Sequence, residues 1–187
     1  MTHTGTQPIE TARLILRPFT MEDCGGVFEN RASDPRVQRE YGEPVYADRA
    51  AAAELLAGWI GRYAAPDFYR WAVVEKGSGE NLGQIAFCRV YDDCAAAEIE
   101  YCIGARFWGR GFSGEALGAV IDHAFRHTAF QKLEAFHRTA NRKSGRVLEK
   151  SVMTVTDNVE RFRRENKTPE GEVCYAVTRA AYLAKTK

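Results

Sequence analysis

Apolar and polar positions follow strand or helix spacing along most of the chain, and this pattern predicts its elements. The segment "ARLILRPF" (12–19) is typical of a strand closed by Pro18. A turn or short helix is expected next, and Asp48 is a suitable N-cap for a longer helix in "DRAAAAELLAGWIGRYA". The apolar side chains of that helix lie on one stripe, formed by Leu55, Leu56, Trp59, Ile60 and Tyr63.

Three strands are predicted in the middle of the chain. "YRWAVVEK" (69–76) and "ENLGQIAFCRV" (80–90) flank a glycine-containing loop, which favours an antiparallel hairpin. The third strand, "AAEIEYCIG" (96–104), alternates regularly between two faces. One face carries Ile99, Tyr101 and Ile103, and the other carries Glu98, Glu100 and Cys102.

The second half of the chain predicts a parallel pairing. After residue 111, helical spacing joins Ala116, Leu117, Val120, Ile121, Ala124 and Phe125, and "QKLEAFHRT" (131–139) is typical of a strand. Strand, helix and strand then form a βαβ unit. A short helix in "NRKSGRVLEKS" has Asn141 at or near its N-cap, and a last strand is expected at 173–178. The fold class is therefore mixed α/β (α+β), with a sheet partly antiparallel and partly parallel and not doubly wound.

Composition narrows the class of protein. The chain has 187 residues and is 45% hydrophobic, so we expect one domain over 1–187 with its core at about 10–180. Basic and acidic residues number 26 and 25, which gives no reason to expect a nucleic-acid or membrane partner. No apolar run reaches a membrane span of about 18 residues, and the start lacks an export signal, so a cytoplasmic location is expected.

Cysteine and histidine positions do not predict a metal site. The five cysteines are scattered and never spaced as C-x-x-C, which favours reduced thiols. His123 and His127 are four residues apart on the predicted helix, a spacing that can hold zinc. The intervening residues lack the glutamate of the zinc-protease motif and no third ligand is evident, so a solvated helix face is the preferred interpretation.

A glycine cluster precedes the predicted crossover helix, in "FWGRGFSGEALGAVIDHAF" (107–125). One interpretation is a tight turn. The other is an anion site, because the first amides of a helix lack partners and carry partial positive charge. In that case Gly109, Gly111 and Gly114 would let the backbone fold around a pyrophosphate. Ser113 would add a hydroxyl, and Arg106 or Arg110 would add a charge.

The same glycines formally match the dinucleotide fingerprint G-x-G-x-x-G. That fingerprint belongs near the start of a βαβ unit, with an acidic residue at the tip of the second strand about 20 residues later. Glu134 is 20 residues after Gly114 but begins its strand, and hairpins precede the motif. Dinucleotide binding is therefore the weaker alternative.

Two motifs in order resemble the GNAT superfamily of acetyl-CoA-dependent N-acetyltransferases, specifically the ribosomal-protein alanine N-acetyltransferase branch. They are the W-G-x-G-[FY]-[AS]-x-E-A loop at Trp108 to Ala116 and the N-x-x-S-x-x-V-L-E-K helix at Asn141 to Lys150. "ETARLILRPFTMED" and "AEIEYCIG" precede them, so the resemblance covers roughly residues 10 to 180.

The resemblance implies a GNAT fold, with a mostly antiparallel central sheet, a splayed parallel strand pair and helices on both faces. It implies acetyl-CoA as cosubstrate, a primary amine as acceptor and no metal. By the resemblance, Ile103 and Gly104 would contact the pantetheine arm of acetyl-CoA, and Asn141 would also reach the cofactor. The pyrophosphate would be cradled by the loop Trp108, Gly109, Arg110, Gly111, Phe112, Ser113 and Gly114. A homodimer is left open.

Acetyl transfer to an amine needs a proton acceptor and a proton for the departing thiolate. Glu98 and Glu100 share one strand face, about 7 Å apart at a rise of about 3.3 Å per residue, and either is a candidate base. Exposure to water is the alternative for both. By resemblance Ser144 is the proton donor, with helix capping as its alternative role, and Tyr101 and Tyr175 are in reserve.

One departure from the family pattern stands out. The family usually continues L-G-[FM] after V-L-E-K, whereas this chain has "SVM" at 151–153. Loss of that glycine puts the turn in doubt, and the stretch "TVTDNVERFRREN" after it has no clear strand pattern. A non-catalytic acyl-CoA-binding module is therefore kept as the alternative function.

Overall fold

The computed structural model describes residues 1–186, which form eight strands and seven α-helices. The strands are β1 (Ile9–Glu10), β2 (Leu14–Arg17), β3 (Arg70–Glu75), β4 (Asn81–Tyr91), β5 (Ala96–Ile103), β6 (Lys132–Arg138), β7 (Thr154–Val155) and β8 (Glu172–Thr178). The α-helices are α1 (Cys24–Val27), α2 (Pro35–Tyr41), α3 (Arg49–Arg62), α4 (Phe112–His127), α5 (Arg142–Glu149), α6 (Glu160–Glu165) and α7 (Arg179–Lys185). Short turns of other helix types are η1 (Met21–Asp23), η2 (Phe28–Ala32) and η3 (Ala105–Phe107).

The strands form one mixed sheet in the order β1-β2-β3-β4-β5-β6-β8-β7. β5 and β6 pair in parallel, with Glu98 opposite Glu134, and α4 connects them along the chain. These three elements form the predicted βαβ unit. The pairs β1–β2, β2–β3, β3–β4, β6–β8 and β7–β8 are antiparallel. The predicted fold class, a mostly antiparallel sheet with one parallel pair, is confirmed.

The chain forms two compact units. We call one the N-terminal unit, which comprises Thr4–Ala86 and Tyr101–Ala119. The other, the C-terminal unit, comprises Met1–His3, Phe87–Glu100 and the chain from Val120 to residue 186. The boundaries between the two units fall inside β4, β5 and α4.

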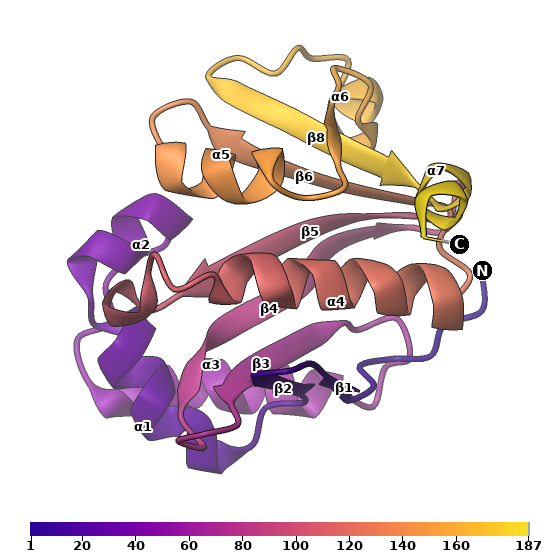
Figure 1. The fold of residues 1–187 in the computed structure, drawn as a ribbon. Helices are drawn as coiled ribbons and strands as arrows, with labels where there is room; N and C mark the ends of the chain where they lie inside the picture. Colours follow the sequence, from indigo (N-terminus) through magenta and orange to yellow (C-terminus); the bar gives the residue numbers. More distant parts are fainter. Residues whose placement is uncertain (187) are drawn as a thin grey trace. The chain divides into compact units, whose positions relative to one another are not determined.

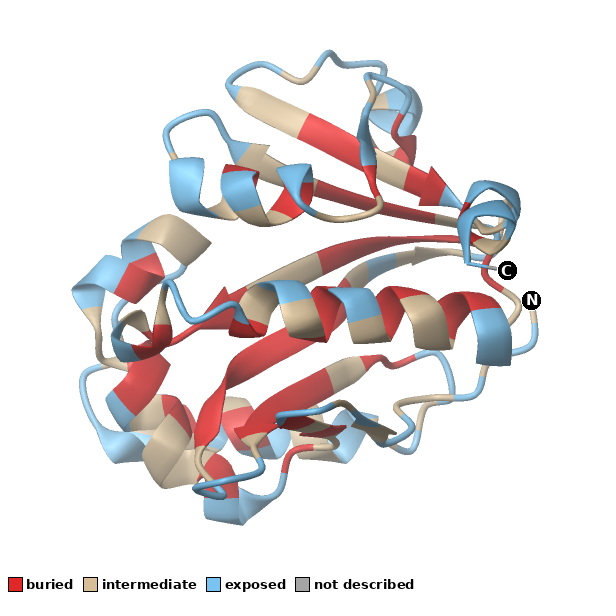
Figure 2. Cartoon of the chain, viewed as in Figure 1, coloured by how far each residue is buried: buried red, intermediate tan, exposed pale blue. Residues whose placement is uncertain are grey.

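The N-terminal unit is built on α3 and the strands that it covers (Figure 1). Asp48 caps α3, because its carboxylate accepts from the amide of Ala51 at 2.9 Å, as the sequence predicts. The fully buried Leu56 of α3 joins a core cluster with Phe19, Val27, Ala32, Ala72 and Val74. Figure 2 shows β3 as mostly buried. In α3 the buried residues are Ala52 and Leu56.

The C-terminal unit has its core around β6 and the second half of α4. Val120, Ile121, Ala124 and Phe125 of α4 are fully buried, as are Leu133 in β6 and Phe130 ahead of it. Phe130 also contacts the ring of Phe87 edge-on, at 5.0 Å between centroids. All six apolar positions predicted for the buried face of α4 are at most 1% exposed.

Several short elements were not predicted from the sequence. Residues 21–41 hold η1, α1, η2 and α2 where only a turn or short helix was expected. α2 has ordinary local signals, since Asp34 accepts from the amide of Arg36, Pro35 opens the helix and Gly42 ends it at φ +90°. β7, α6 and α7 lie in the last third of the chain.

Candidate functional site

The glycine loop joins the end of β5 to α4 within the N-terminal unit. It is shaped at its start by the Trp108 indole, whose Nε1 donates to the carbonyl of Ile103 at 2.7 Å. Gly109 and Gly111 then adopt left-handed φ angles of +78° and +82°. An L-residue pays about 1–2 kcal/mol in that conformation, so glycine at both positions has a backbone reason.

The main-chain amides of this loop are available to a ligand. Those of Gly109, Arg110 and Gly111 make no hydrogen bond to any residue in the part of the chain that the structure describes, and all three residues are exposed. The first intrahelical amide bond of α4 is donated by Glu115 to the carbonyl of Gly111 at 3.1 Å. The earlier amides of the helix are therefore also directed at its N-terminus, where an anion binds favourably.

An ion pair from the turn between β1 and β2 braces the loop. Glu115 accepts from the hydroxyl of Thr11 at 2.5 Å, from the Arg13 amide at 2.9 Å and from Arg13 Nε at 2.6 Å. Arg13 Nη1 in turn donates to the carbonyl of Arg110 at 3.0 Å. Burial raises the pKa of Glu115, but the bonds from Thr11 and Arg13 outweigh it and hold the pKa below its usual range. The loop is thus fixed before any ligand binds.

The cationic side chains of the loop have acidic partners. Arg110 Nη2 pairs with Glu75 at 3.0 Å, and Arg106 forms an ion pair with Glu80. Both arginines are about half exposed, so each pair is weak and can be exchanged for a ligand anion. The sequence identified these arginines but gave no sign of Glu75 and Glu80 as their partners.

Ile103 and Gly104 are buried at the end of β5. The amide of Gly104 donates to the carbonyl of Leu82 at 2.8 Å, and a Cβ on Gly104 would lie 2.4 Å from the carbonyl oxygen of Asn30. Gly104 is therefore a close-approach position where η2 lies against the strand end. Its amide and the Ile103 carbonyl are engaged within the protein.

The two candidate carboxylates of β5 have different surroundings. Glu98 is 3% exposed and forms ion pairs with Arg89 at 2.6 Å and Arg161 at 3.5 Å, so it does not face water. Arg161 also pairs with Glu172 and stacks on Phe136, with its guanidinium carbon 4.1 Å from the ring centroid. Glu100, by contrast, is half-buried. The sequence placed the two on one face but could not separate their environments.

The candidate proton donor and the candidate cofactor ligand of α5 lie together in the C-terminal unit. Asn141 is the N-cap, and its Oδ1 accepts from the amide of Ser144 at 3.1 Å. Capping is therefore the work of Asn141, and the hydroxyl of Ser144 is not the cap. The buried Gly145 lies against β6, where a Cβ would come 2.9 Å from the ring of His137.

The "SVM" departure keeps a closed turn. The hydroxyl of Ser151 donates to the carbonyl of Leu148 at 2.7 Å and accepts from the amide of Met153 at 3.1 Å. No residue from 150 to 153 has a positive φ. The serine side chain thus closes the turn without the family's glycine, and β7 follows, paired with β8.

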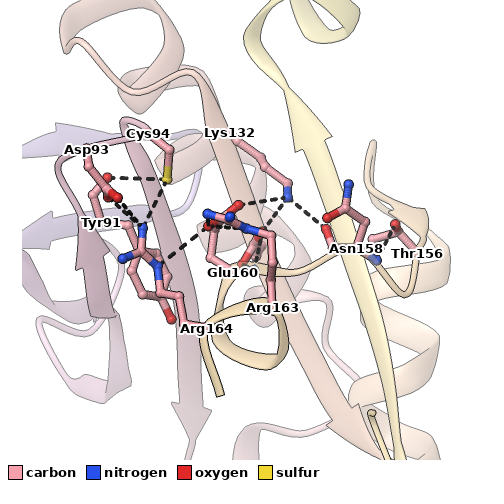
Figure 3. A network of polar contacts seen from close by, with 10 residues as sticks. Tyr91, Asp93, Cys94, Lys132, Thr156, Asn158, Glu160, Arg163 and Arg164 are labelled. Carbon is pink, nitrogen blue, oxygen red and sulfur yellow. Dashed lines mark hydrogen bonds and ion pairs between the residues drawn. The ribbon is translucent and has the colours of Figure 1, made fainter. Parts of the chain in front are cut away.

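A polar network fixes the segment after β7 (Figure 3). Glu160, 6% exposed, pairs with Arg163 and Arg164, and its amide donates to Glu134 at 3.0 Å. Burial raises the pKa of Glu134, although Lys132 at 2.6 Å favours its ionised form. The stretch whose strand pattern was unclear therefore holds the helix α6, anchored by ion pairs that the sequence pattern did not indicate.

Other candidates from the sequence are placed as follows. Cys102 is 6% exposed, and burial raises the pKa of the reserve residue Tyr175. His123 and His127 lie 5.3 Å apart between ring centroids, and no group of three or more potential metal ligands occurs among residues 1–186. Within the same residues, no helix is both long and apolar enough to cross a membrane.

Comparisons with known proteins agree with this architecture. The family described as "Acetyltransferase (GNAT) domain" matches residues 13–154. The uncharacterized N-acetyltransferase YoaA of Bacillus subtilis is 26% identical over 171 residues, which cover 91% of this chain and 96% of that protein. A GNAT-family acetyltransferase from Bacillus anthracis superposes with a TM-score of 0.75 at 21% identity, covering 93% of this chain and 99% of the other.

A third protein bears on the predicted branch. The ribosomal-protein-S5-alanine acetyltransferase of Vibrio fischeri superposes with a TM-score of 0.74 at 15% identity, covering 92% of this chain and 97% of its own. At that identity the likeness concerns the fold. The domain match over residues 13–154, together with the mixed sheet and the glycine loop, places this chain in the GNAT acetyltransferase family.

Proposed function

We propose that the protein transfers an acetyl group from acetyl-CoA to a primary amine in the cytoplasm. The observation that carries the proposal is the set of exposed, unpaired amides at Gly109, Arg110 and Gly111, ahead of the α4 N-terminus. A diphosphate is the part of coenzyme A that such amides suit, because they offer several donors and a positive dipole end to one anion. When bound, acetyl-CoA supplies the activated acyl thioester.

We assign further cofactor contacts to residues around the loop. Trp108, Ser113 and Gly114 complete the assigned cradle, and Arg110 can exchange Glu75 for a phosphate. Asn141 keeps the cofactor contact that the family resemblance implies. The resemblance also places Ile103 and Gly104 at the pantetheine arm, but the Ile103 carbonyl and the Gly104 amide are engaged within the protein, so we assign these two residues to shaping the strand end.

Glu100 is our candidate for the base that takes a proton from the acceptor amine. Glu98 is the second candidate, but it is buried and ion pairs with Arg89 and Arg161 occupy both of its oxygens. Ser144 is our candidate for the donor that returns a proton to the departing thiolate, and the helix is capped by Asn141. Direct attack by the amine needs no covalent enzyme intermediate.

The experiment that tests the cradle is a glycine substitution with a matched control. Gly111→Val forces a β-branched residue into φ +82°, whereas Gly118→Val adds the same side chain to an exposed glycine with open space around it. Calorimetric titration with coenzyme A should show at least about a tenfold loss of affinity for Gly111→Val and ordinary affinity for Gly118→Val. Equal affinity in the two variants would remove the loop from the cofactor site.

The alternative, a non-catalytic acyl-CoA-binding module, had the "SVM" sequence as its support. Since Ser151 closes that turn, we favour the enzyme. Thioester consumption with a panel of amines separates the two, because a binding module would take up coenzyme A without turnover on any of them. The acceptor amine is either a protein N-terminus or a small molecule.

A further inference from the structure

A buried arginine without an anionic partner lies in the N-terminal unit. Arg31 is 2% exposed, and no carboxylate in the described part of the chain forms an ion pair with it. Its Nε and Nη2 are buried and have no hydrogen-bond partner. Burying a guanidinium without a hydrogen-bonded partner costs free energy, which a bound anion would offset.

The two unused nitrogens are the pair that binds a carboxylate side-on. Arg36, five residues later, uses Nε and Nη2 to hold both oxygens of Asp34, at 3.0 and 2.7 Å. The fork of Arg36 is thus occupied, at the surface, whereas that of Arg31 is unoccupied, in the interior. A planar carboxylate with two oxygens is the complement of this fork.

Arg31 is surrounded by an aromatic ring, a second arginine and polar side chains. Its guanidinium carbon lies 5.2 Å from the Trp59 ring centroid, and Arg70 lies 4.4 Å from the same centroid. Arg70 donates to the Gln84 amide at 2.5 Å, and Gln84 donates to the Tyr41 hydroxyl at 2.6 Å. Two guanidinium groups therefore share one indole ring, which adds positive charge to the surroundings of Arg31.

Backbone and side-chain observations nearby also point to a ligand. Arg31 belongs to η2, a π-helical turn closed by the amide of Ser33 on the carbonyl of Phe28 at 3.1 Å. Such turns are rare and are frequent at functional sites. Gln38 in the next helix is 1% exposed, and its Oε1 has no donor although its Nε2 donates to Pro44. A buried fork of donors and a buried acceptor are thus both unsatisfied.

We propose that Arg31 binds the carboxylate of the acceptor, so that the acceptor is an amino acid or a related small amine that carries a carboxylate. This rests on the proposed function, which supplies the amine. A protein N-terminus or a polyamine lacks a carboxylate beside its amine and would leave the fork unfilled. Because Arg31 is almost fully buried, the ligand must displace a neighbour, and Tyr41 is the half-buried ring at the end of α2, next to the exposed residues 42–45.

The test compares amino acids with their amides in wild type, Arg31→Gln, Arg31→Lys and Arg36→Gln. Wild type should prefer the acid over the amide by about tenfold or more in kcat/KM, the effect of a charged, bidentate hydrogen bond. The preference should collapse in Arg31→Gln and return only in part in Arg31→Lys, whose single charge is not a fork. Arg36→Gln, a surface control, should keep the wild-type preference.

A binding measurement without acetyl-CoA separates this inference from the proposed function. Amino acids should raise the Tm of wild type and not that of Arg31→Gln, with inorganic phosphate as a comparison anion. Equal use of acid and amide, a preference that survives in Arg31→Gln, or stabilisation by phosphate alone would overturn the inference while leaving acetyl transfer intact. Amino-acid binding at Arg31 with no turnover of any amine would support it and count against the enzyme.

Discussion

Gly104→Ala tests whether η2 is seated directly on the end of β5. Gly104 has φ −57°, so alanine meets no backbone strain there, and the effect depends on packing alone. The new Cβ would lie 2.4 Å from the carbonyl oxygen of Asn30 and 3.1 Å from its Cβ. To reach even 3.0 Å, either the strand end or the π-helical turn must move as backbone, since no flexible side-chain tip can give way.

Overpacking that moves backbone costs about 1–3 kcal/mol. For a chain of this size about 2–4 °C of Tm corresponds to each kcal/mol, so the Tm of Gly104→Ala should fall by roughly 2–12 °C. Gly118→Ala is the matched control, because Gly118 is exposed, helical and has open space, and alanine there should add about 0.5–1 kcal/mol. Urea and thermal unfolding followed by circular dichroism would measure both. If Gly104→Ala were as stable as the control, the close approach of Asn30 would be wrong.

The remaining predictions concern the active groups and the brace of the loop. Glu100→Gln should lower kcat most at low pH while sparing coenzyme A affinity, and a pH–rate profile parallel to wild type would exclude Glu100 as the base. Ser144→Ala should slow turnover without loss of helix stability, because Asn141 is the cap, and an unchanged kcat would remove Ser144 from the chemistry. Glu115→Gln should cost about 1 kcal/mol at pH 7, since the folded pKa of Glu115 lies below its ordinary 4.5. The stability that Glu115 contributes is present above its pKa in the unfolded state and is lost as pH falls through its pKa in the folded state. The urea midpoints of wild type and Glu115→Gln should therefore converge below about pH 4. A difference between the midpoints that stayed constant with pH would contradict the role of the charge.

Long periodic segments were predicted well because their local and tertiary preferences agree. The apolar spacing of α4 can be recognised from the sequence without knowing what the helix packs against. Asp48 indicates the start of α3 because its carboxylate can cap the first turn of the helix. The region from η1 to α2 was missed for the opposite reason. Its sequence, "MEDCGGVFENRASDPRVQREY", has no sustained period, and its conformation depends on contacts such as that between Asn30 and Gly104.

The site could be predicted only where backbone chemistry decides it. A cluster of glycines ahead of a helix can be recognised in the sequence, and the loop lies at the predicted position with Gly109 and Gly111 at positive φ. Burial of charge is not visible in the same way, because arginine and glutamate are ordinarily surface residues. Arg31 and Glu98 are both exceptions, and each is recognised only once its neighbours in space are known.

The interleaving of the two units sets an order on biosynthesis. As the polypeptide emerges from its N-terminus, the N-terminal unit possesses all its residues once position 119 has been made, whereas the other still lacks everything from Val120 onward. Residues 1–3 and 87–100 therefore belong to a unit that is complete only after the residues from Val120 onward have been made. Neither unit is one continuous segment of the chain. A product that stopped near residue 119 would present the amides of the glycine loop while the C-terminal unit was still incomplete.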